Sequence, residues 1–225
     1  MTTHTFTLAG HGPVTFDIDS LVIAGWTGRD MAMVEHHIAE LEAIGVARPK
    51  SVPTFYRVAA KLLSSDAVIE VPGSDSSGEA EFVLFSTEYG LLVGIGSDHT
   101  DRKVESYGVT VSKQMCGKPV GDTLWRYADV AGHWDQLQMR SWRERAGVPA
   151  LYQDGPVTRM LSPEDLILRY TGQASLPLGS AMFCGTQPII GEMGHGDAFA
   201  LELYDPALQR RLQHRYAVQT LPVEG

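Results

Sequence analysis

The chain has 225 residues, 44% of them hydrophobic and 20% charged, a composition that is ordinary for a folded protein and excludes a disordered chain. Its formal net charge of −9 and pI near 5.3 disfavour a nucleic-acid-binding surface, because such surfaces depend on clustered Lys and Arg. No apolar run approaches the length of a membrane span. We therefore expect neither a nucleic-acid nor a membrane partner.

No linker or internal repeat divides the sequence, so residues 1–225 are predicted to form a single domain. The first residues lack the charged and apolar segments of a secretory signal, which predicts a cytoplasmic protein. Cys116 and Cys184 are far apart in the sequence and are expected to be reduced thiols. For each, a small buried hydrophobic residue is favoured over a nucleophile.

The N-terminal part predicts a hairpin, a buried strand and a helix. Polar and apolar residues alternate over residues 4–24, which predicts a hairpin that leads into the buried strand LVIAG, residues 21–25. Apolar residues then recur at helical spacing over residues 29–45. On this helix His37 and Glu40 are three residues apart and share a face. The pattern alone favours a solvated face with an incidental ion pair.

Three acidic residues stand at the ends of two strand-like runs. The run AEFVLF, residues 80–85, follows Glu79 and contains Glu81, so both carboxylates leave one face with Cα atoms about 6.6 Å apart. The glycine-spaced run LLVGIG, residues 91–96, leads to Asp98. Three oxygen ligands without His or Cys suit magnesium, manganese or calcium rather than zinc. A half-exposed strand with outward charges explains the same pattern equally well.

The rest of the chain predicts further strands and one more helix. Residues 106–112 alternate like a strand that ends at Lys113, and residues 54–63 are ambiguous between strand and helix. Ser162 followed by proline and two acids predicts the start of a short helix. A late strand is predicted at residues 196–204, followed by a helical or extended tail.

Six short motifs, taken together and in order, resemble the signature of the fumarylacetoacetate hydrolase superfamily. They are HIAE (37–40), FYRV (55–58), EAE (79–81), SDHTDR (97–102), SK (112–113) and LPLGSAMFCGTQP (176–188). The resemblance covers roughly residues 20–204 and is closest to a divergent, DUF2848-like branch of the superfamily. Arg57 replaces a lysine of the family, Lys103 replaces an acid, and Gln187 is inserted into Gly-Thr-Pro. These departures bear on the substrate more than on the metal.

The resemblance implies an α+β, mixed but mainly β, fold of layered sheets with few short helices, and a homodimer. It also implies that one divalent cation, Mg²⁺ or Mn²⁺, is bound by three acids, Glu79, Glu81 and Asp98. The implied partner is a small-molecule carboxylate substrate.

The resemblance further implies a role for each remaining motif. His37, made more basic by Glu40, would take a proton from water. Lys113 and Arg57 would hold the substrate carboxylate or an oxyanion. Thr186 would line the opposite wall of the site.

These roles describe a metal-dependent hydrolase that cleaves a carbon–carbon or related carbon–nitrogen bond of an acylpyruvate-like oxo acid through a stabilised enolate. A lyase, meaning an oxo-acid decarboxylase or hydratase, would use the same site. A catalytically silent small-molecule-binding protein of this fold is the third alternative.

Overall fold

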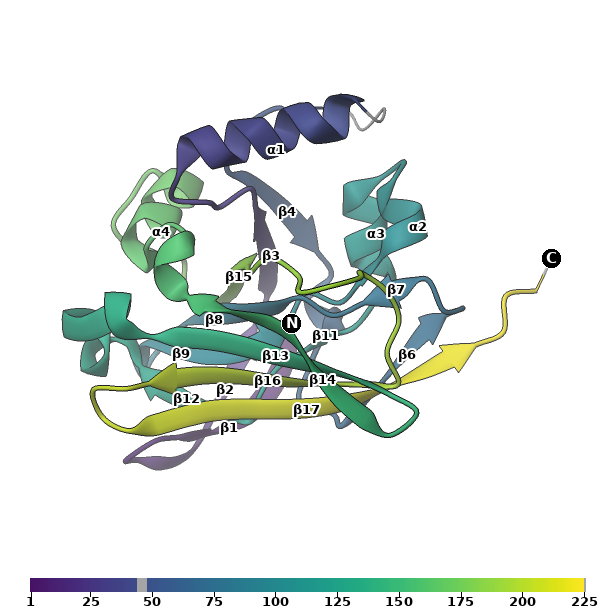
Figure 1. The fold of residues 1–225 in the computed structure, drawn as a ribbon. Helices are drawn as coiled ribbons and strands as arrows, with labels where there is room; N and C mark the ends of the chain where they lie inside the picture. The colour runs from purple at the N-terminus through teal and green to yellow at the C-terminus, as the bar shows by residue number, and fades with distance from the viewer. Residues whose placement is uncertain (44–47, 225) are drawn as a thin grey trace.

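The computed structural model describes residues 1–43 and 48–224, without the side chains of His37, Glu40, Leu41 and Ala43 (Figure 1). Strands predominate and the helices are few and short, so the predicted fold class is confirmed. The longer strands are β1 (Thr2–Leu8), β2 (Gly12–Ile18), β3 (Ser20–Gly25), β4 (Thr54–Val58), β6 (Val68–Pro72), β8 (Ala80–Thr87), β9 (Gly90–Ser97), β12 (Thr123–Arg126), β13 (Gln138–Arg145), β14 (Val148–Pro156), β15 (Ser180–Thr186), β16 (Ala198–Asp205) and β17 (Arg210–Leu221). The two-residue strands are β5 (Leu63–Ser64), β7 (Ser76–Ser77), β10 (Thr100–Asp101) and β11 (Lys118–Pro119).

An eight-stranded sheet in the order β2-β1-β12-β9-β8-β15-β3-β4 forms the centre of the fold. The predicted N-terminal hairpin is β1 and β2, which pair antiparallel from Thr2 opposite Ile18 to Leu8 opposite Gly12. The buried strand LVIAG is the greater part of β3, which lies between β15 and β4. Strand β8, with the acid pair at its start, lies in the middle of this sheet.

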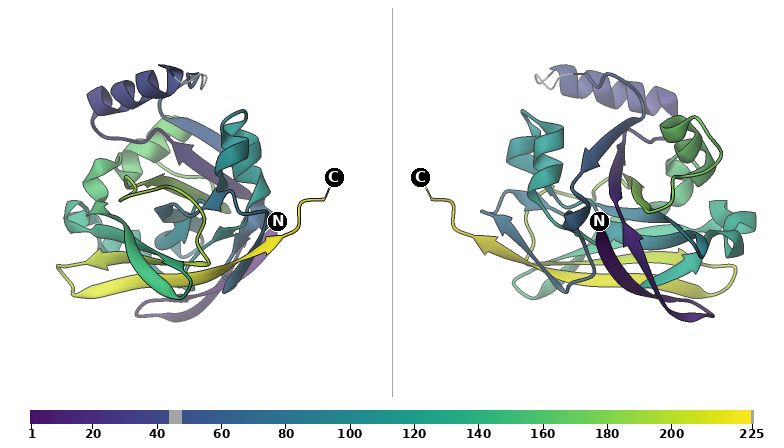
Figure 2. Two further views of the ribbon diagram at one scale, coloured as in Figure 1. Left: turned by 45° about the vertical axis from the view of Figure 1, so that its right-hand side comes forward. Right: turned by 180° about the vertical axis from the view of Figure 1, so that it is seen from behind.

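A five-stranded sheet in the order β14-β13-β16-β17-β6 packs against one face of the central sheet (Figure 2). Apolar residues from both sheets fill the layer between them, which we call the inter-sheet core. Phe82 and Leu84 of β8 contribute from one side, and Phe199 and Leu201 of β16 from the other. The central sheet curls, so that its own β1–β2 hairpin covers part of its opposite face. Phe6 and Phe16 of the hairpin are among the residues buried there.

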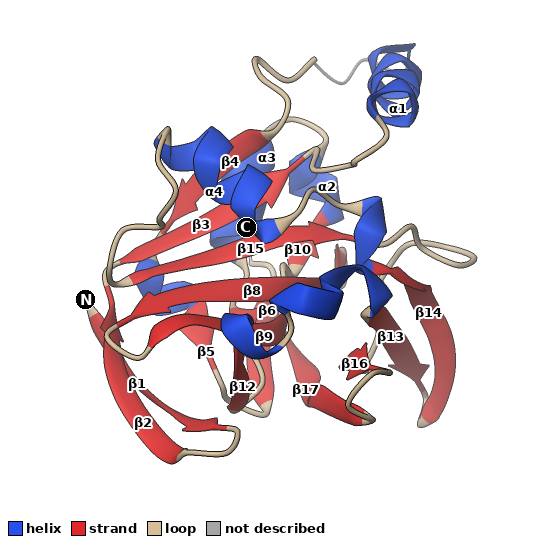
Figure 3. Ribbon diagram, turned by 90° about the vertical axis from the view of Figure 1, so that its left-hand side faces the viewer, coloured by secondary structure: helices blue, strands red, loops and turns tan. Residues whose placement is uncertain are grey.

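The helices lie around the sheets rather than between them: two of them lie together near the start of β8, and the other two lie apart from this pair (Figure 1 and Figure 3). They are α1 (Met31–Ala43), α2 (Arg102–Glu105), α3 (Val109–Met115) and α4 (Pro163–Thr171). Short 3-10 turns occupy Ala60–Leu62, Tyr127–Asp129, Ala131–Gln136 and Val157–Arg159. Helix α4 begins as predicted, because the Ser162 hydroxyl accepts a hydrogen bond from the backbone N–H of Asp165.

Residues 106–112, predicted to be a strand, belong instead to the turn after α2 and to α3. The alternating pattern was misleading because hydrophobicity does not decide which side of this segment is buried. Val111 and Tyr107 are exposed, whereas Ser112 and Lys113 are buried. Residues 54–63, whose pattern was ambiguous, form β4, a 3-10 turn and the start of β5.

Candidate metal centre

Antiparallel pairing of β8 with β9 brings the three acids together. Ala80 lies opposite Ser97, so the residues just beyond this pair, Glu79 and Asp98, are also neighbours. The backbone N–H of Asp98 donates to the Glu79 carbonyl at 3.0 Å. One carboxylate oxygen from each of Glu79, Glu81 and Asp98 lies within 4.8 Å of the other two. We call these three residues the acid cluster.

Cationic side chains contact two members of the acid cluster. Lys113 Nζ contacts Asp98 Oδ2 and lies 3.9 Å from Glu79 Oε2. Lys118 Nζ lies 3.1 Å from Asp98 Oδ1, and Arg102 Nη1 lies 3.1 Å from Glu79 Oε1. The contact between Lys118 and Asp98 has the distance of an ion pair but not the angle of a hydrogen bond. Three positive charges therefore face the three carboxylates.

Glu81 has no such cation among these contacts. It is 3% exposed, and its Oε2 accepts a hydrogen bond from the backbone N–H of Gly185 at 2.7 Å. Burial, together with the charges of Asp98 and Glu79, raises the pKa of Glu81 well above its usual value. A buried carboxylate beside two others is costly unless a cation lies near it.

The charges of the acid cluster and its lysines are strongly coupled. Burial would raise the pKa of Asp98, but Lys113 and Lys118 lower it to about 2. Burial likewise opposes the charged form of Lys113, but Asp98 and Glu79 raise its pKa above the usual range. For Lys118, burial and the nearby Lys113 lower the pKa against the opposing effect of Asp98. Asp98 is therefore an ionised carboxylate at neutral pH.

The donor set fits a hard divalent cation. The acid cluster offers only carboxylate oxygens, it is largely shielded from water, and its oxygens are close enough to share one ion. No other group of three or more His, Cys, Asp or Glu side chains with this spacing occurs in the described part of the chain. Glu79, Glu81 and Asp98 would hold the cation.

Lys113 reaches the acid cluster from α3, and Tyr56 lies beside it. The ammonium group of Lys113 is 5.8 Å from the centre of the Tyr56 ring, a cation–π distance. Tyr56 was not among the predicted site residues. The sequence pattern that could have indicated Tyr56 is the alternation of side chains along β4, which places Tyr56 and Arg57 on opposite faces of the sheet.

Arg57 lies on the face of the central sheet opposite to the acid cluster. It pairs with Val22, a residue of the inter-sheet core, whereas Glu81 alternates with the core residue Phe82 and so points the other way. Strand β4 is three strands from β8, which separates them by about 14 Å. Arg57 Nη1 instead donates to the Tyr170 hydroxyl at 3.4 Å. Its role in binding a substrate stays a prediction.

Thr186 lies opposite Glu81, but its hydroxyl is occupied by protein groups. It donates to the Ala80 carbonyl at 2.8 Å and accepts from Gln153 Nε2 at 2.7 Å. Thr186 therefore lies beside the acid cluster, where its hydroxyl links β15 to β8 and β14 by hydrogen bonds. Gln187 is 1% exposed and donates to the Pro156 carbonyl at 2.8 Å, so the inserted residue packs inward.

The remaining predicted residues are the two of the proposed dyad and the two cysteines. His37 and Glu40 belong to α1, but their side chains lie outside the described residues, so the proposed dyad stays a prediction. Cys116 and Cys184 are buried free thiols, as expected. Burial raises the pKa of Cys116 to about 11 and that of Cys184 well above its usual value, which disfavours a thiolate nucleophile.

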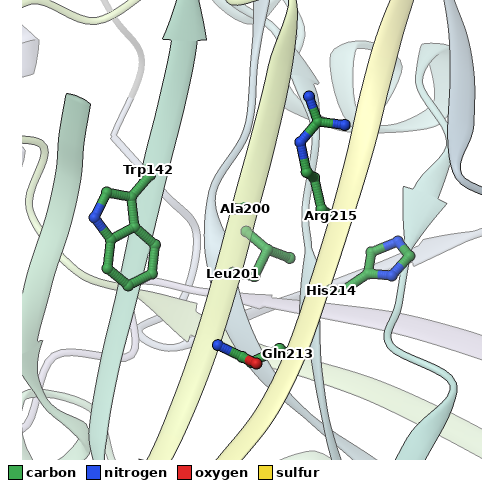
Figure 4. A pocket seen from close by; sticks show the side chains of 6 residues that line it. All are labelled: Trp142, Ala200, Leu201, Gln213, His214 and Arg215. Carbon is green, nitrogen blue, oxygen red and sulfur yellow. The ribbon is translucent and has the colours of Figure 1, made fainter. Parts of the chain in front are cut away.

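A pocket on β13, β16 and β17 lies outside the acid cluster (Figure 4). It is lined by Trp142, Ala200, Leu201, Gln213, His214 and Arg215. Arg215 donates to Glu144 at 2.8 Å, and none of the lining residues is acidic. This pocket therefore lacks the ligands for a hard cation, and the acid cluster is the better candidate site.

Comparison with known proteins places the chain in a family. Residues 24–216 match the family described as protein of unknown function (DUF2848). No curated protein matches the sequence.

No helix in the described residues is long and apolar enough to cross a membrane.

Solved structures share the fold at low sequence identity. The crystal structure of Cg1458 with inhibitor has a TM-score of 0.66 and 16% identity, and the match covers 91% of this chain and 78% of that one. A hexagonal crystal form of 2-keto-3-deoxyarabinonate dehydratase has a TM-score of 0.65 and 13% identity over 95% of this chain and 78% of that one. 2-Keto-3-deoxy-D-arabinonate dehydratase complexed with magnesium and 2,5-dioxopentanoate has a TM-score of 0.61 and 14% identity, with the same coverage of 95% and 78%. The chain belongs to the DUF2848 family and has the fold of the fumarylacetoacetate hydrolase superfamily, as its six motifs predicted.

Proposed function

We propose that this protein is a metal-dependent hydrolase that cleaves a carbon–carbon or related carbon–nitrogen bond of a small, acylpyruvate-like oxo acid. The observation that carries the proposal is the buried acid cluster, whose oxygens converge within 4.8 Å while Lys113 lies against two of its members. A cation there and an ammonium group beside it match the two charges of a 2-oxo acid during reaction, the carboxylate and the developing enolate.

The proposed metal is Mg²⁺ or Mn²⁺, held by Glu79, Glu81 and Asp98. When bound, it supplies Lewis-acid stabilisation of negative charge on the substrate. Mg²⁺ in the similar dehydratase complex supports this choice.

The chain's own residues then bind the substrate and move the proton. Lys113, a point charge held at the acid cluster, binds the substrate carboxylate. His37, with Glu40 three residues further along the same helix, takes a proton from water. The water oxygen bonds to the distal carbonyl carbon and the carbon–carbon bond breaks. The electron pair stays on the oxo-acid fragment as an enolate, which takes up a proton to give the free 2-oxo acid.

A lyase is the second candidate. Its support is the similarity in fold to a dehydratase whose complex contains magnesium and a small oxo compound. Such an enzyme would use the same acid cluster and Lys113, and it would not need attack by water. Product analysis separates the two, because hydrolysis of an acylpyruvate yields two acids whereas dehydration or decarboxylation yields one oxo product and water or carbon dioxide.

Replacing the proposed general base tests the hydrolase. His37→Ala is expected to lower kcat on the best acylpyruvate substrate by about 10² to 10⁴, because a general base contributes that much. The rise in melting temperature on adding Mg²⁺ should persist. Steady-state kinetics and thermal melting in the same buffer measure both.

The matched control is His36→Ala, which removes an exposed imidazole from the adjacent position of α1. It should leave kcat within about twofold of the wild type. Near-normal kcat in His37→Ala would exclude the dyad, and a single oxo product from every active substrate would favour the lyase.

A further inference from the structure

Every carboxylate of the acid cluster has one oxygen that contacts a donor. The contacts are Arg102 Nη1 to Glu79 Oε1 at 3.1 Å, Lys118 Nζ to Asp98 Oδ1 at 3.1 Å, and Gly185 N to Glu81 Oε2 at 2.7 Å. The donors come from α2, β11 and β15, three separate elements. We call these contacts the outer contacts of the acid cluster.

The other oxygens of two carboxylates converge on one point. Asp98 Oδ2 and Glu79 Oε2 both have Lys113 Nζ as their neighbour. Lys113 Nζ is the neighbour that both oxygens share, so a cation bound by them would lie beside this ammonium group. The outer contacts therefore leave one oxygen per carboxylate for a shared cation, and chelation by both oxygens of a carboxylate would require breaking an outer contact.

Lys118 is an outer donor that is held at two points. Its side chain is fully buried, and Nζ also donates to the backbone carbonyl of His99 at 2.6 Å. Its backbone lies in β11, which pairs in parallel with β5. A buried ammonium group held by two oxygens keeps its position relative to Asp98.

We propose that Lys118 makes the metal site selective for small octahedral cations such as Mg²⁺ and Mn²⁺ over Ca²⁺, by keeping Asp98 a ligand through one oxygen only. This inference rests on the proposed function, since it concerns the metal of that site. Mg²⁺ takes single carboxylate oxygens and water in a tight octahedron, whereas Ca²⁺ takes six to eight oxygens and commonly binds carboxylates through both.

The positive charge of Lys118 repels both ions alike, because they carry the same charge. Removing it should strengthen the binding of Mg²⁺ and Ca²⁺ together, and this common effect cancels in the ratio of their dissociation constants. A change in this ratio therefore reports only whether Asp98 Oδ1 has become available as a second ligand atom. A merely structural role for Lys118 would not change it.

The test is calorimetric titration of chelator-stripped protein with Mg²⁺ and, separately, with Ca²⁺. The wild type should bind Mg²⁺ more tightly than Ca²⁺. Lys118→Met, which keeps the length of the side chain without its charge, should shift the ratio of the two dissociation constants toward Ca²⁺ by about tenfold or more. Lys61→Met, a change at an exposed lysine, is the matched control and should keep the wild-type ratio.

Lys118→Gln is made in parallel and decides the matter if the methionine variant does not fold by circular dichroism, because glutamine retains a hydrogen-bond donor without the charge. An unchanged ratio in the folded variant, or tighter binding of Ca²⁺ than of Mg²⁺ by the wild type, would overturn the role of Lys118 and leave the metal site standing. Absence of binding of either ion to the wild type would overturn the metal site itself.

Discussion

Gln153 is the residue that joins the acid cluster to the loop after β15. It is fully buried, and its Nε2 donates to Thr186 Oγ1 and to the Gln187 carbonyl, both at 2.7 Å. Its Oε1 accepts from the backbone N–H of Ala80 at 2.9 Å and from the Ser141 hydroxyl at 2.8 Å. Both amide hydrogens and both acceptor positions are thereby used.

Replacing Gln153 should therefore cost both stability and metal affinity. Gln153→Leu leaves the Ala80 N–H and the Gln187 carbonyl buried without this partner, so the free energy of unfolding should fall by about 2 to 3 kcal/mol. Because Ala80 lies between Glu79 and Glu81, Mg²⁺ affinity should fall about tenfold. Urea unfolding and calorimetric titration measure the two effects.

The same change at an exposed glutamine, Gln173→Leu, is the control and should alter the free energy of unfolding by less than about 0.5 kcal/mol. If Gln153→Leu had the same urea midpoint as the wild type, the hydrogen bonds of the Gln153 amide would not contribute to stability.

Single residues of the site differ in how far the sequence could predict them. Glu79 and Glu81 are two apart, and strand geometry alone puts both carboxylates on one face. Gln153 and Lys118 carry no such signal, because their partners lie far away in the sequence. Gln153 bonds Ala80 across 73 positions, and Lys118 bonds the His99 carbonyl across 19. Only the sheet topology brings these groups together.

At the scale of elements, ion pairs rather than apolar packing decide how α3 lies. Its buried residues are Ser112 and Lys113, whereas Val111 is 52% exposed. Hydrophobic periodicity therefore predicted a strand where a helix presents Lys113 to Asp98. Strands β1 and β2 were predicted correctly because burial there follows the alternation, and β8 because its apolar run is buried on both faces.

The turn between β16 and β17 depends on one buried carboxylate. Asp205 is fully buried, its Oδ1 accepts from the backbone N–H groups of Ala207 and Leu208, and its Oδ2 accepts from Arg210 at 3.1 Å. His133 Nε2 lies 3.0 Å from Oδ1. Burial alone would raise the pKa of Asp205, but the contacts with His133, Leu208 and Arg210 outweigh it and lower the pKa below its usual value.

This lowered pKa predicts a loss of stability in acid. The folded state binds the Asp205 proton less readily than the unfolded state, whose pKa is about 3.9. The contribution of Asp205 is therefore complete above that value and is lost as the pH falls through the folded pKa. Asp205→Asn should lower the free energy of unfolding by about 1 to 3 kcal/mol at pH 7, with a smaller difference from the wild type in acid.

Urea unfolding of both proteins at several pH values measures that difference, with the exposed Asp129→Asn as control. A difference that did not change with pH would show that the Asp205 charge contributes nothing to the turn.

At the scale of the whole molecule, the two-layered β fold follows from the motifs and the family they indicate, but the strand order does not. The central sheet places β15 between β8 and β3, although these strands are far apart in the sequence. This order puts Gly185 beside Glu81, which alternation within each strand cannot reveal. The single domain, the homodimer and the cytoplasmic location stay predictions.

The balance of charge around the acid cluster predicts how the whole protein responds to metal. Lys113, Lys118 and Arg102 face the three carboxylates and offset much of their negative charge without a bound cation, while Arg102 also pairs with Glu105 at 2.9 Å. Chelator-stripped protein should therefore remain folded. An ion that binds only the folded state must raise the melting temperature, by about 5 to 10 °C at a concentration one hundred times its dissociation constant.

Glu79→Ala/Glu81→Ala should abolish this rise with millimolar Mg²⁺ or Mn²⁺, while the double change at two exposed acids, Glu70→Ala/Glu88→Ala, should preserve it. Thermal melting of the three proteins, with and without the ions, makes the comparison. A rise confined to the proteins with an intact acid cluster would establish it as the metal site. Equal melting temperatures in all conditions would leave three carboxylates neutralised by the protein's own cations, and the catalytically silent binding protein would then be the better account of this fold.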